Sequence, residues 1–404
     1  MKVLQINTVY AKGSTGRIVT SIEKVCNESG IVPIVAFGFS DIHSGENLYN
    51  ISDWISTRVH EHIYSRIFDS QGFGSYFSTL KLLKWIDIQK PDIIHLHNLH
   101  GNYININLLV NYINTYNLPV IWTLHDCWPI TGHCTHFDYI GCEKWKKGCY
   151  RCPLSKEYPS SLCLDLSHRN YRKKKELFTS IKHITIVPVS EWLASQIRMS
   201  FLKDYHIQVI YNGINLDIFK PLKDGIRNKY DISNKKILLG VGTSWSNLKG
   251  LNEFIELSKL KKYQVILVGV SEDIKSMLPS NIITIEKTNS QEELAKYYSA
   301  ADVLVNPTYN DSFPTINLES LACGTPVVTY RTGGSPEAVG YGCGEVVDKG
   351  DFQSLVNAIE TICQKGKNEY FTNCIELAKS NYDDNKCYHK YIELYESIYS
   401  SFSL

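Results

Sequence analysis

The sequence lacks long hydrophobic runs, and it lacks an excess of charge of either sign. No stretch of 18 or more apolar residues occurs among its 404 residues, so no membrane-spanning helix is predicted. The formal net charge is only +1, whereas a dedicated nucleic-acid-binding domain is usually strongly basic. We therefore expect an ordinary globular protein with no nucleic-acid partner.

The N-terminus also lacks the features of a signal peptide. Its apolar run ends at Ile6, and no small-residue cleavage site follows it. We therefore expect a cytoplasmic protein. In that compartment the twelve cysteines are expected to be free thiols or metal ligands rather than disulfides.

Short β-branched runs alternate with amphipathic stretches along most of the chain, a rhythm typical of parallel sheets with helical crossovers. It predicts an α/β protein with doubly wound sheets. Strands are expected at 2–7, 32–37, 92–97, 120–124, 184–189, 236–242, 265–269, 282–285, 302–306 and 326–330. Helices are expected at 16–28, 103–116, 169–178, 191–202, 250–260, 291–298, 315–323 and about 383–400.

The alternation restarts after a polar connector that begins at Asn212-Gly213. We therefore predict a first domain over 1–210 and a second over 211–382. A closing helix at about 383–404 is expected to pack back on the first domain. Ligands of such sheets bind beyond the carboxyl ends of the strands, which predicts a cleft lined by both domains.

One stretch concentrates the polar chemistry of the second domain. Asp311 lies in a loop after an expected strand, a helix is expected from Thr315, and Glu319 follows about one turn later. The free N–H groups at a helix start favour anions such as phosphate. Two carboxylates beside a phosphate-binding helix start suit a sugar nucleotide, with Glu319 accepting from the ribose hydroxyls and Asp311 from a sugar hydroxyl.

This stretch, with the Ala322-Cys323-Gly324-Thr325-Pro326-Val327-Val328 run that follows it, resembles the signature of the retaining glycosyltransferases of family 4. The resemblance implies the GT-B fold, in which two Rossmann-like domains face each other across a cleft. It implies that Asp311, where the family usually has Glu, contacts the donor sugar and that Glu319 binds the ribose. It assigns the loop contacts with the donor sugar and phosphates to Phe313, Pro314, Thr315, Ile316, Asn317 and Leu318.

A second part of the resemblance is the loop from Gly242 to Gly250. The family typically has an Arg near the start of this loop and a Lys-Gly pair at its end, and both cations bind the donor diphosphate. Lys249 matches the lysine, but Thr243 and Ser244 stand where the arginine is expected. The resemblance therefore makes Lys249 and Ser244 donor-site residues, and Arg331 is a candidate for the missing cation.

The first domain carries the remaining matches. Gly13, Gly16 and Arg17 lie in the first strand-to-helix loop, which in the family shapes the acceptor and phosphate side. His125, at the end of an expected strand, matches the histidine that meets the donor sugar. Asp126 is expected to orient that ring or to meet the acceptor, and His97 is expected to line the same cleft.

Four cysteines follow His125 at a spacing of Cys-x7-Cys-x6-Cys-x2-Cys. They could close a tetrahedral structural zinc site, lie close enough to cross-link, or be plain buried cysteines. No cofactor is expected to be required for catalysis. The four residues are Cys134, Cys142, Cys149 and Cys152.

The resemblance implies transfer of a hexose, with retention, from a UDP- or GDP-sugar in bacterial O-antigen or exopolysaccharide assembly. The expected acceptor is an undecaprenyl-diphosphate-linked glycan. A lipid-linked acceptor suggests peripheral docking on the inner face of the plasma membrane, and the basic stretch 169–178 is the candidate for contact with an anionic membrane surface. The alternatives are an epimerase or phosphorylase of the same fold, or a non-catalytic scaffold containing zinc.

Overall fold

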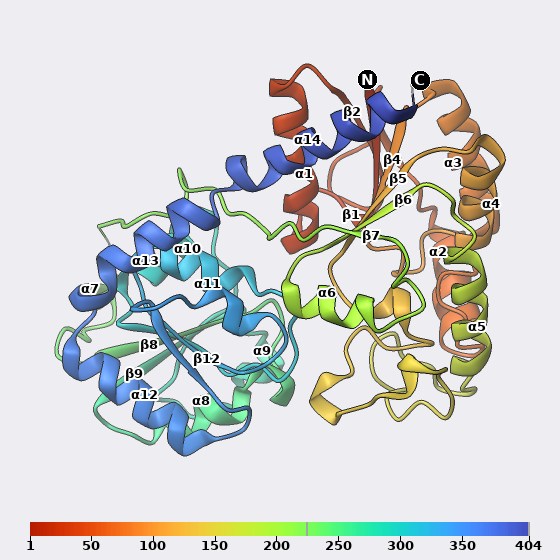
Figure 1. Cartoon of the computed structure of the whole chain (residues 1–404). Helices are drawn as coiled ribbons and strands as arrows, with labels where there is room; N and C mark the ends of the chain where they lie inside the picture. The colour runs from red at the N-terminus through yellow and green to blue at the C-terminus, as the bar shows by residue number, and fades with distance from the viewer. Residues whose placement is uncertain (224, 403–404) are drawn as a thin grey trace. The chain divides into compact units, whose positions relative to one another are not determined.

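The chain forms two compact units, each built on one parallel sheet (Figure 1). The computed structural model describes residues 1–223 and 225–402, and in these residues one sheet has seven strands and the other has six. The first unit comprises Met1–Tyr211 and Tyr388–Leu404, and the second comprises Asn212–Cys387. The predicted α/β class with parallel, doubly wound sheets is confirmed.

The sheet of the first unit has the order β3-β2-β1-β4-β5-β6-β7, and its described pairings are parallel. Its strands are β1 (Lys2–Val9), β2 (Val32–Phe39), β3 (Leu48–Asn50), β4 (Ile93–Leu96), β5 (Val120–Leu124), β6 (Ile184–Pro188) and β7 (His206–Ile207).

Helices cover both faces of this sheet. Helices α1 and α14 lie on one face, and α3, α4 and α5 lie on the other (Figure 1). The bounds are α1 (Gly13–Glu28), α2 (Trp54–Val59), α3 (Tyr76–Gln89), α4 (Ile106–Tyr116), α5 (Ser167–Phe178), α6 (Glu191–Arg198) and α14 (Asp384–Phe402). A π-helical turn η1 (His60–Ser65) continues α2, and three 3₁₀ turns follow β5 at η2 (Trp128–Ile130), η3 (Asp138–Ile140) and η4 (Lys144–Lys146).

The first strand and helix show how the sequence builds this unit. Five consecutive residues of β1 are buried, which is typical of a central parallel strand covered on both faces. Helix α1 buries Ile18, Val19, Ile22 and Val25, a spacing that places them on one side. The helix begins at Gly13, three residues before the predicted start, and Gly13 has a φ of 64°, which glycine adopts without steric cost.

The sheet of the second unit has the order β10-β9-β8-β11-β12-β13. Its strands are β8 (Lys236–Val241), β9 (Tyr263–Val268), β10 (Ile283–Ile285), β11 (Val303–Asn306), β12 (Val327–Tyr330) and β13 (Gly344–Val347). Its helices and 3₁₀ turns are α7 (Ile226–Lys229), η5 (Asn247–Lys249), α8 (Leu251–Ser258), α9 (Glu272–Lys275), α10 (Gln291–Ala300), α11 (Thr315–Ala322), η6 (Ser335–Ala338), α12 (Phe352–Lys365) and α13 (Asn368–Asn381).

Each sheet has a point at which the strand order reverses. In the first unit the reversal lies between β1 and β4, and in the second it lies between β8 and β11. The loops leaving two such strands diverge to opposite faces of the sheet and open a crevice at their carboxyl ends, where ligands of doubly wound folds bind. These two loop pairs are therefore the places to examine for a site.

The closing helix α14 completes the first unit from the far end of the chain. The predicted helix at 383–404 begins at Asp384 and is described to Phe402, and its last two predicted residues, 403 and 404, lie outside the described residues. The hydroxyl of Tyr395 bonds Nδ1 of His95 at 2.6 Å, and the hydroxyl of Tyr391 bonds Oγ1 of Thr123 at 2.8 Å. The helix is thus tied to β4 and β5 by buried polar contacts.

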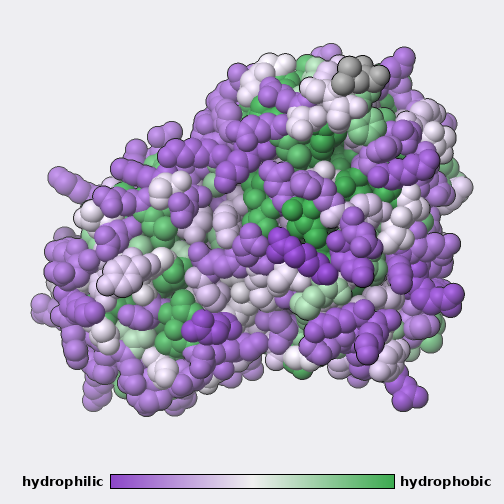
Figure 2. Space-filling model, in the orientation of Figure 1, coloured by the Kyte–Doolittle hydropathy of each residue, from purple (hydrophilic) through white to green (hydrophobic). Residues whose placement is uncertain are grey.

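Most of the surface seen in Figure 2 is hydrophilic, with smaller apolar patches. Among the described residues, every helix is too short or too polar to reach across a bilayer.

Candidate active site

The reversal point of the second unit joins two residues that the sequence assigns to the donor site. Lys249 ends η5 after β8, and Asp311 lies in the loop after β11. The Lys249 ammonium donates to Oδ2 of Asp311 at 3.0 Å and to the carbonyl of Asn310 at 3.2 Å. The Lys249 side chain is 38% exposed and that of Asp311 25%, so this ion pair is within reach of a ligand from solvent.

The loop between Asp311 and α11 is held in a fixed shape. Oδ1 of Asp311 accepts from the backbone N–H of Phe313 at 3.2 Å, and Pro314 precedes the first residue of α11. Gly333 approaches so closely that a Cβ there would lie 1.7 Å from the carbonyl oxygen of Asp311, and its φ of 53° also favours glycine. The start of α11 therefore presents its N–H groups at a defined place.

Three buried polar groups around this loop have no hydrogen-bond partner within the described part of the chain. They are Nδ2 of Asn317, Oγ1 of Thr332 and Oγ of Ser335. Asn317 lies in α11, and its Oδ1 accepts from Nδ2 of Asn306 at 2.9 Å. Native proteins leave few buried polar groups unsatisfied, so these groups are available to water or to polar ligand atoms.

The rest of the predicted loop contributes mainly backbone. Phe313 and Leu318 are buried, and Phe313 packs near Tyr382 with ring centroids 6.0 Å apart. Thr315 and Ile316 open α11 and are half-buried. Little side-chain surface of this loop is therefore exposed, and binding of the donor through its backbone stays a prediction.

Glu319 is more enclosed than a surface carboxylate. It is 6% exposed, and its Oε2 accepts from the hydroxyl of Tyr298 in α10 at 2.7 Å. This bond fixes the carboxylate one turn into α11, on the side of the helix that packs towards α10. The sequence singled out Glu319 but not Tyr298, whose spacing in a separate helix gives no sign of the contact.

Two further predicted donor-site residues, Ser244 and the candidate cation Arg331, have different surroundings from Lys249. Ser244 is exposed in the loop after β8. Arg331 directly follows β12, but its side chain is 63% exposed and its Nε pairs with Asp348 at 3.2 Å. The described contacts of Arg331 therefore lead to the surface beyond β13 and not to Lys249 or Asp311.

The reversal point of the first unit brings together the loops after β1 and β4. Oγ1 of Thr8 donates to the carbonyls of Asn98 at 3.0 Å and His100 at 2.5 Å. The start of α1 lies in the same loop region: Gly16 is buried against the backbone of Tyr10, whereas Arg17 is exposed. A side chain at Gly16 would crowd this turn.

His125 and His97 form a hydrogen-bonded pair at the ends of β5 and β4. Nε2 of His125 lies 3.2 Å from Nδ1 of His97, whose Nε2 lies 3.2 Å from Oε1 of Gln5. Gln5 donates its own amide N–H to the carbonyl of Val19, so its oxygen faces His97 as an acceptor. His97 is therefore protonated at Nε2, and His125 donates to it from its Nε2.

Both histidines are held neutral. Burial lowers the pKa of His125 to about 4, although the nearby Asp126 charge acts in the opposite direction. Burial and the neighbouring histidines hold the pKa of His97 well below its usual range. A neutral His125 that carries its proton on Nε2 has a bare Nδ1, which accepts hydrogen bonds.

Two side chains of this region have surroundings other than those expected. His97 does not line an open surface, because it is only 1% exposed behind His125. The described bonds of Asp126 do not lead to the His125 ring, because its Oδ2 bonds Nε2 of His100 at 2.7 Å and its Oδ1 accepts from the N–H of Trp128. The alternative role of Asp126, contact with the acceptor, stays a prediction. Burial alone would raise the pKa of Asp126, but the His100 contact brings it below its usual range.

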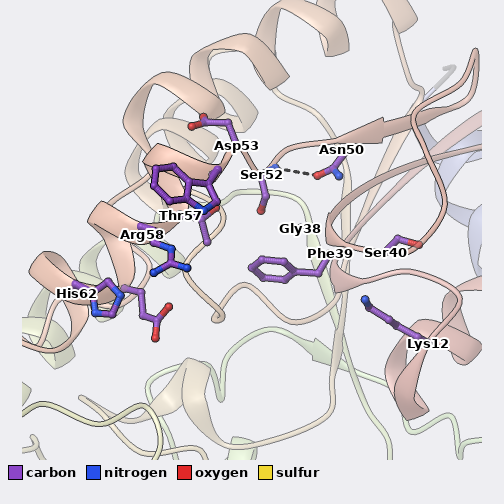
Figure 3. A pocket seen from close by; sticks show the side chains of 12 residues that line it. Lys12, Gly38, Phe39, Ser40, Asn50, Ser52, Asp53, Thr57, Arg58 and His62 are labelled. Atoms are coloured by element: carbon purple, nitrogen blue, oxygen red, sulfur yellow. Dashed lines mark hydrogen bonds between the residues drawn. The ribbon is translucent and has the colours of Figure 1, made fainter.

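The first unit also contains a cavity of about 570 Å³, which lies between the segments that follow β1, β2 and β3. Lys12, which precedes α1, and Phe39, which ends β2, face Arg58 and His62 from α2 and η1 across it (Figure 3). Two carboxylates of its wall have partners: Asp53 accepts from Ser56 and Ser78, and Glu61 pairs with Arg66. No motif in the sequence predicts this cavity, because its walls come from several separate segments.

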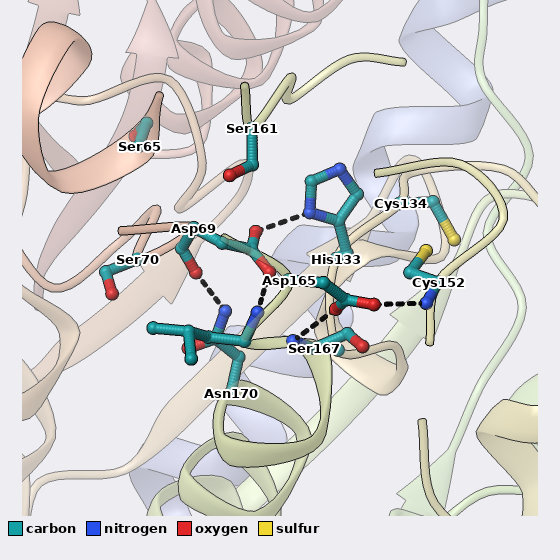
Figure 4. Close-up of polar contacts among 12 residues, drawn as sticks. Ser65, Asp69, Ser70, His133, Cys134, Cys152, Ser161, Asp165, Ser167 and Asn170 are labelled. Carbon is teal, nitrogen blue, oxygen red and sulfur yellow. Dashed lines mark hydrogen bonds and ion pairs between the residues drawn. The ribbon is translucent and has the colours of Figure 1, made fainter. Parts of the chain in front are cut away.

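The four cysteines of the predicted cluster make different contacts. Among the described residues, no group of three or more His, Cys, Asp or Glu side chains is arranged to hold a metal ion. The thiols of Cys134 and Cys152 are free and hydrogen-bond to each other, and their sulfur atoms lie side by side in Figure 4. The sulfur of Cys149 instead accepts from the N–H of Gly132 at 3.1 Å, and Cys142 is half-buried nearby. This arrangement gives no support to the zinc alternative, which stays a prediction.

A polar network anchors this region to the segment before α3 (Figure 4). Nδ1 of His133 bonds Oδ1 of Asp69 at 2.5 Å, and Oδ2 of Asp69 accepts from the N–H of Leu166 at 2.8 Å. Asp165 accepts from the N–H groups of Cys152 and Ser167. These carboxylates are used to hold loops together.

Comparison with known proteins gives consistent matches along the chain. The family model of Glycosyltransferase Family 4 matches residues 32–218, and that of Glycosyl transferases group 1 matches residues 223–380. The Escherichia coli K12 protein named for colanic acid biosynthesis, glycosyl transferase WcaC, is 21% identical to this chain, over 98% of this chain and 100% of its own length.

Two solved structures share the arrangement of elements. Sucrose-phosphate synthase from Thermosynechococcus elongatus superposes with a TM-score of 0.75 at 16% identity, covering 99% of this chain and 100% of its own. Anabaena HepE in complex with UDP-glucose superposes with a TM-score of 0.66 at 17% identity, covering 98% and 100%. At these identities the likeness shows the fold.

Proposed function

The chain belongs to glycosyltransferase family 4 and has the GT-B fold, and from this premise we propose that it transfers a hexose from a UDP- or GDP-sugar to a lipid-linked oligosaccharide with retention of configuration. The observation that carries the proposal is the Lys249–Asp311 pair at the carboxyl ends of β8 and β11. A cation in that place offsets the charge of a departing diphosphate. The HepE structures contain UDP and UDP-glucose, which supports a nucleotide-sugar donor.

The described residues suit the steps of such a transfer. Lys249 and the N–H groups at the start of α11 stabilise the negative charge that develops on the leaving diphosphate. Glu319 binds the ribose hydroxyls, and its bond from Tyr298 keeps the carboxylate in place. Asp311 accepts from a hydroxyl of the donor sugar, and the bare Nδ1 of His125 accepts from another.

No described residue is assigned as a covalent nucleophile in this proposal. The bond between the anomeric carbon and the phosphate oxygen breaks while the acceptor oxygen forms its bond on the same face. The proton of the acceptor hydroxyl passes to the departing phosphate oxygen. The protein supplies position and charge, and no metal or cofactor takes part in the proposed step.

The first unit is proposed to bind the acceptor. Its cavity presents Lys12, Arg58 and His62 beside the aromatic rings of Phe39 and Trp54, a combination that suits sugars next to an anionic diphosphate. WcaC is named for colanic acid, a polysaccharide. We extend this to a role in bacterial surface polysaccharide assembly on an undecaprenyl-diphosphate-linked glycan, at the inner face of the plasma membrane.

Two substitutions test the donor site. Lys249→Ala and Glu319→Ala should each lower donor-dependent turnover by more than about tenfold, the scale of losing a charge-assisted contact. They should also weaken the thermal stabilisation of the protein by UDP or GDP, since a ligand stabilises in proportion to its affinity. Lys259→Ala is the matched control, because Lys259 pairs only with the exposed Glu256.

The outcomes separate the proposal from its alternatives. Full turnover in both variants would remove the donor-site assignment. Interconversion of free nucleotide-sugars without an acceptor would indicate an epimerase, and a requirement for inorganic phosphate would indicate a phosphorylase. A protein that binds neither UDP nor GDP would indicate a non-catalytic scaffold.

A further inference from the structure

A short segment of the first unit exposes an unusual number of large apolar side chains. Between Trp54 and Phe77 nine such side chains are exposed, and Phe77 and Ile55 reach 75% and 66%. Apolar side chains scattered singly over a surface need no explanation, whereas a concentration of them marks an interaction site. We call six of these exposed side chains the apolar surface: Ile55, Val59, Ile63, Ile67, Phe68 and Phe77.

The apolar surface stands on a fixed scaffold. Nδ1 of His60 bonds Oγ of Ser75 at 2.8 Å, and its Nε2 accepts from the N–H groups of Gly72 and Gly74 at 3.2 Å. Asp53 caps α2 and also accepts from Oγ of Ser78, which ties the start of α2 to the start of α3. The exposed side chains therefore project from elements joined by buried hydrogen bonds.

A second segment of the chain extends the apolar surface. The N–H of Leu162 donates to the carbonyl of Arg66 at 2.7 Å, so the loop around Leu162 lies directly against η1. Leu162 is 66% exposed and Leu164 is 44% exposed. Two chain segments nearly a hundred residues apart thus add apolar side chains to one region.

Basic side chains border this region. Arg169 of α5 donates to Oγ of Ser70, and the ammonium of Lys173 lies 5.2 Å from the centre of the Phe73 ring. Arg58 and Arg172 are exposed as well. Only part of the predicted basic helix faces solvent, because Lys174 is buried and donates to the carbonyls of Trp128 and Thr131.

The nearby carboxylates offset few of these charges. Asp53 accepts from a backbone N–H and a serine, Glu61 pairs with Arg66, and Asp165 accepts from two backbone N–H groups. These basic groups make no ion pair within the described part of the chain. An exposed apolar surface with such a border fits a membrane with anionic headgroups, where apolar side chains enter the boundary with the acyl chains and cations contact the phosphates.

We propose that the apolar surface and its border of Arg58, Arg169, Arg172 and Lys173 form the docking site of this protein on an anionic lipid bilayer. The inference rests on the proposed function in one respect: a lipid-linked acceptor must be reached at the membrane. It replaces the isolated basic helix of the sequence prediction with a surface in which apolar contacts and charge act together.

The test measures binding of the full chain to vesicles. Wild-type protein should bind vesicles containing phosphatidylglycerol, bind pure phosphatidylcholine vesicles at least tenfold more weakly, and lose affinity as salt is raised. Ile55→Ser combined with Phe77→Ser should weaken binding to both vesicle types at least tenfold. Arg172→Glu should weaken binding to the phosphatidylglycerol vesicles selectively.

The matched control combines Met277→Ser with Tyr341→Ser, which removes exposed apolar side chains from the second unit and should leave vesicle binding unchanged. Thermal unfolding and stabilisation by UDP verify that each variant is folded. Wild-type affinity in the Ile55/Phe77 variant would overturn the proposal. So would a change from dimer to monomer in that variant with no loss of vesicle binding, which would assign the surface to a second copy of the chain.

Failure of this proposal is distinguishable from failure of the proposed function. Vesicle binding needs no donor, and transfer to a water-soluble acceptor analogue needs no vesicle. The Ile55/Phe77 variant should retain transfer to the soluble acceptor while losing the vesicles. Normal vesicle binding without any transfer would instead count against the enzymatic proposal alone.

Discussion

Lys249 and Asp311 neutralise each other at the carboxyl ends of β8 and β11. A diphosphate that takes up Lys249 must draw it away from Asp311 or share it, and the freed carboxylate then becomes available to a sugar hydroxyl. The pair therefore couples recognition of the phosphate to recognition of the sugar. Such a coupling favours an intact nucleotide-sugar over a nucleotide alone.

This coupling gives a prediction for Asp311→Asn. The amide no longer attracts the Lys249 charge, so the affinity for UDP or GDP alone should stay the same or rise. Transfer of the sugar should fall about tenfold or more, because a charge-assisted contact is lost. Calorimetric nucleotide binding and turnover measured on the same preparation check both effects. A parallel loss of nucleotide affinity and turnover would contradict the coupling.

The sequence identifies single site residues better than it identifies their partners. The motifs that contain Asp311, Lys249 and Glu319 have strand and helix signals on either side. These signals predict that each residue lies near the end of a strand or the start of a helix. Tyr298 and Gln5 belong to elements whose patterns report burial only, and their hydrogen bonds depend on tertiary packing. The same holds for the His100–Asp126 contact, which no spacing along the chain encodes.

At the scale of elements, the position of η1 is held by hydrogen bonds of one neutral side chain, His60. Burial lowers the pKa of His60 to about 3, and its Nε2 accepts from Gly72 and Gly74. If Nε2 of His60 took up a proton, it would become a donor. It could then no longer accept from the N–H groups of Gly72 and Gly74. The folded pKa is lower than the unfolded value of about 6.5, so this stabilisation is complete above about pH 6.5 and is lost as the pH falls towards 3.

We therefore expect the free energy of unfolding to fall between pH 7 and pH 5, with His60 contributing about 2 kcal/mol of the loss. In His60→Gln the free energy of unfolding at pH 7 should be lower than in the wild type. Its slope against pH between pH 7 and pH 5 should be smaller, by the equivalent of about one proton bound on unfolding. Urea unfolding followed by tryptophan fluorescence checks this, because six of the seven tryptophans lie in the first unit. An unchanged slope would contradict it.

The elements that the sequence did not predict have different causes. Helix α3 exposes Phe77 and Ile88 and buries Ser78 and Thr79, so its pattern has no clean polar face. Helix α12 buries Leu355, Ala358, Ile359 and Ile362 at helical spacing, and its signal was present in the sequence although no helix was assigned there. Short strands such as β3 and β13 are fixed by neighbouring strands rather than by their own residues.

At the scale of the whole molecule, the first unit is closed by residues from the end of the chain. Tyr395 bonds His95, which also bonds Thr123, and Thr123 bonds Tyr391. The alternating signals of strand and helix predict both sheets, but a polar contact across 300 residues has no local signature. The amphipathic tail alone indicated that a helix would pack somewhere.

Tyr395→Phe should therefore lower the melting temperature of the protein. The substitution leaves Nδ1 of the buried His95 without its partner, a loss of about 1–3 kcal/mol. Tyr341→Phe is the control, because Tyr341 is fully exposed and should change stability by less than about 0.5 kcal/mol. Calorimetry on both variants checks the difference, and equal melting temperatures would show that the buried bond contributes nothing.

The return of α14 to the first unit also sets an order of events during synthesis. Domains usually fold one after another as the chain leaves the ribosome, the N-terminal one first. Here β4 and β5 form their hydrogen bonds with Tyr395 and Tyr391 late, because the ribosome adds these two residues only after the whole second unit. The part of the protein that is made first is thus completed last, and a nascent chain that stalls before α14 holds a finished second unit next to an unfinished first one.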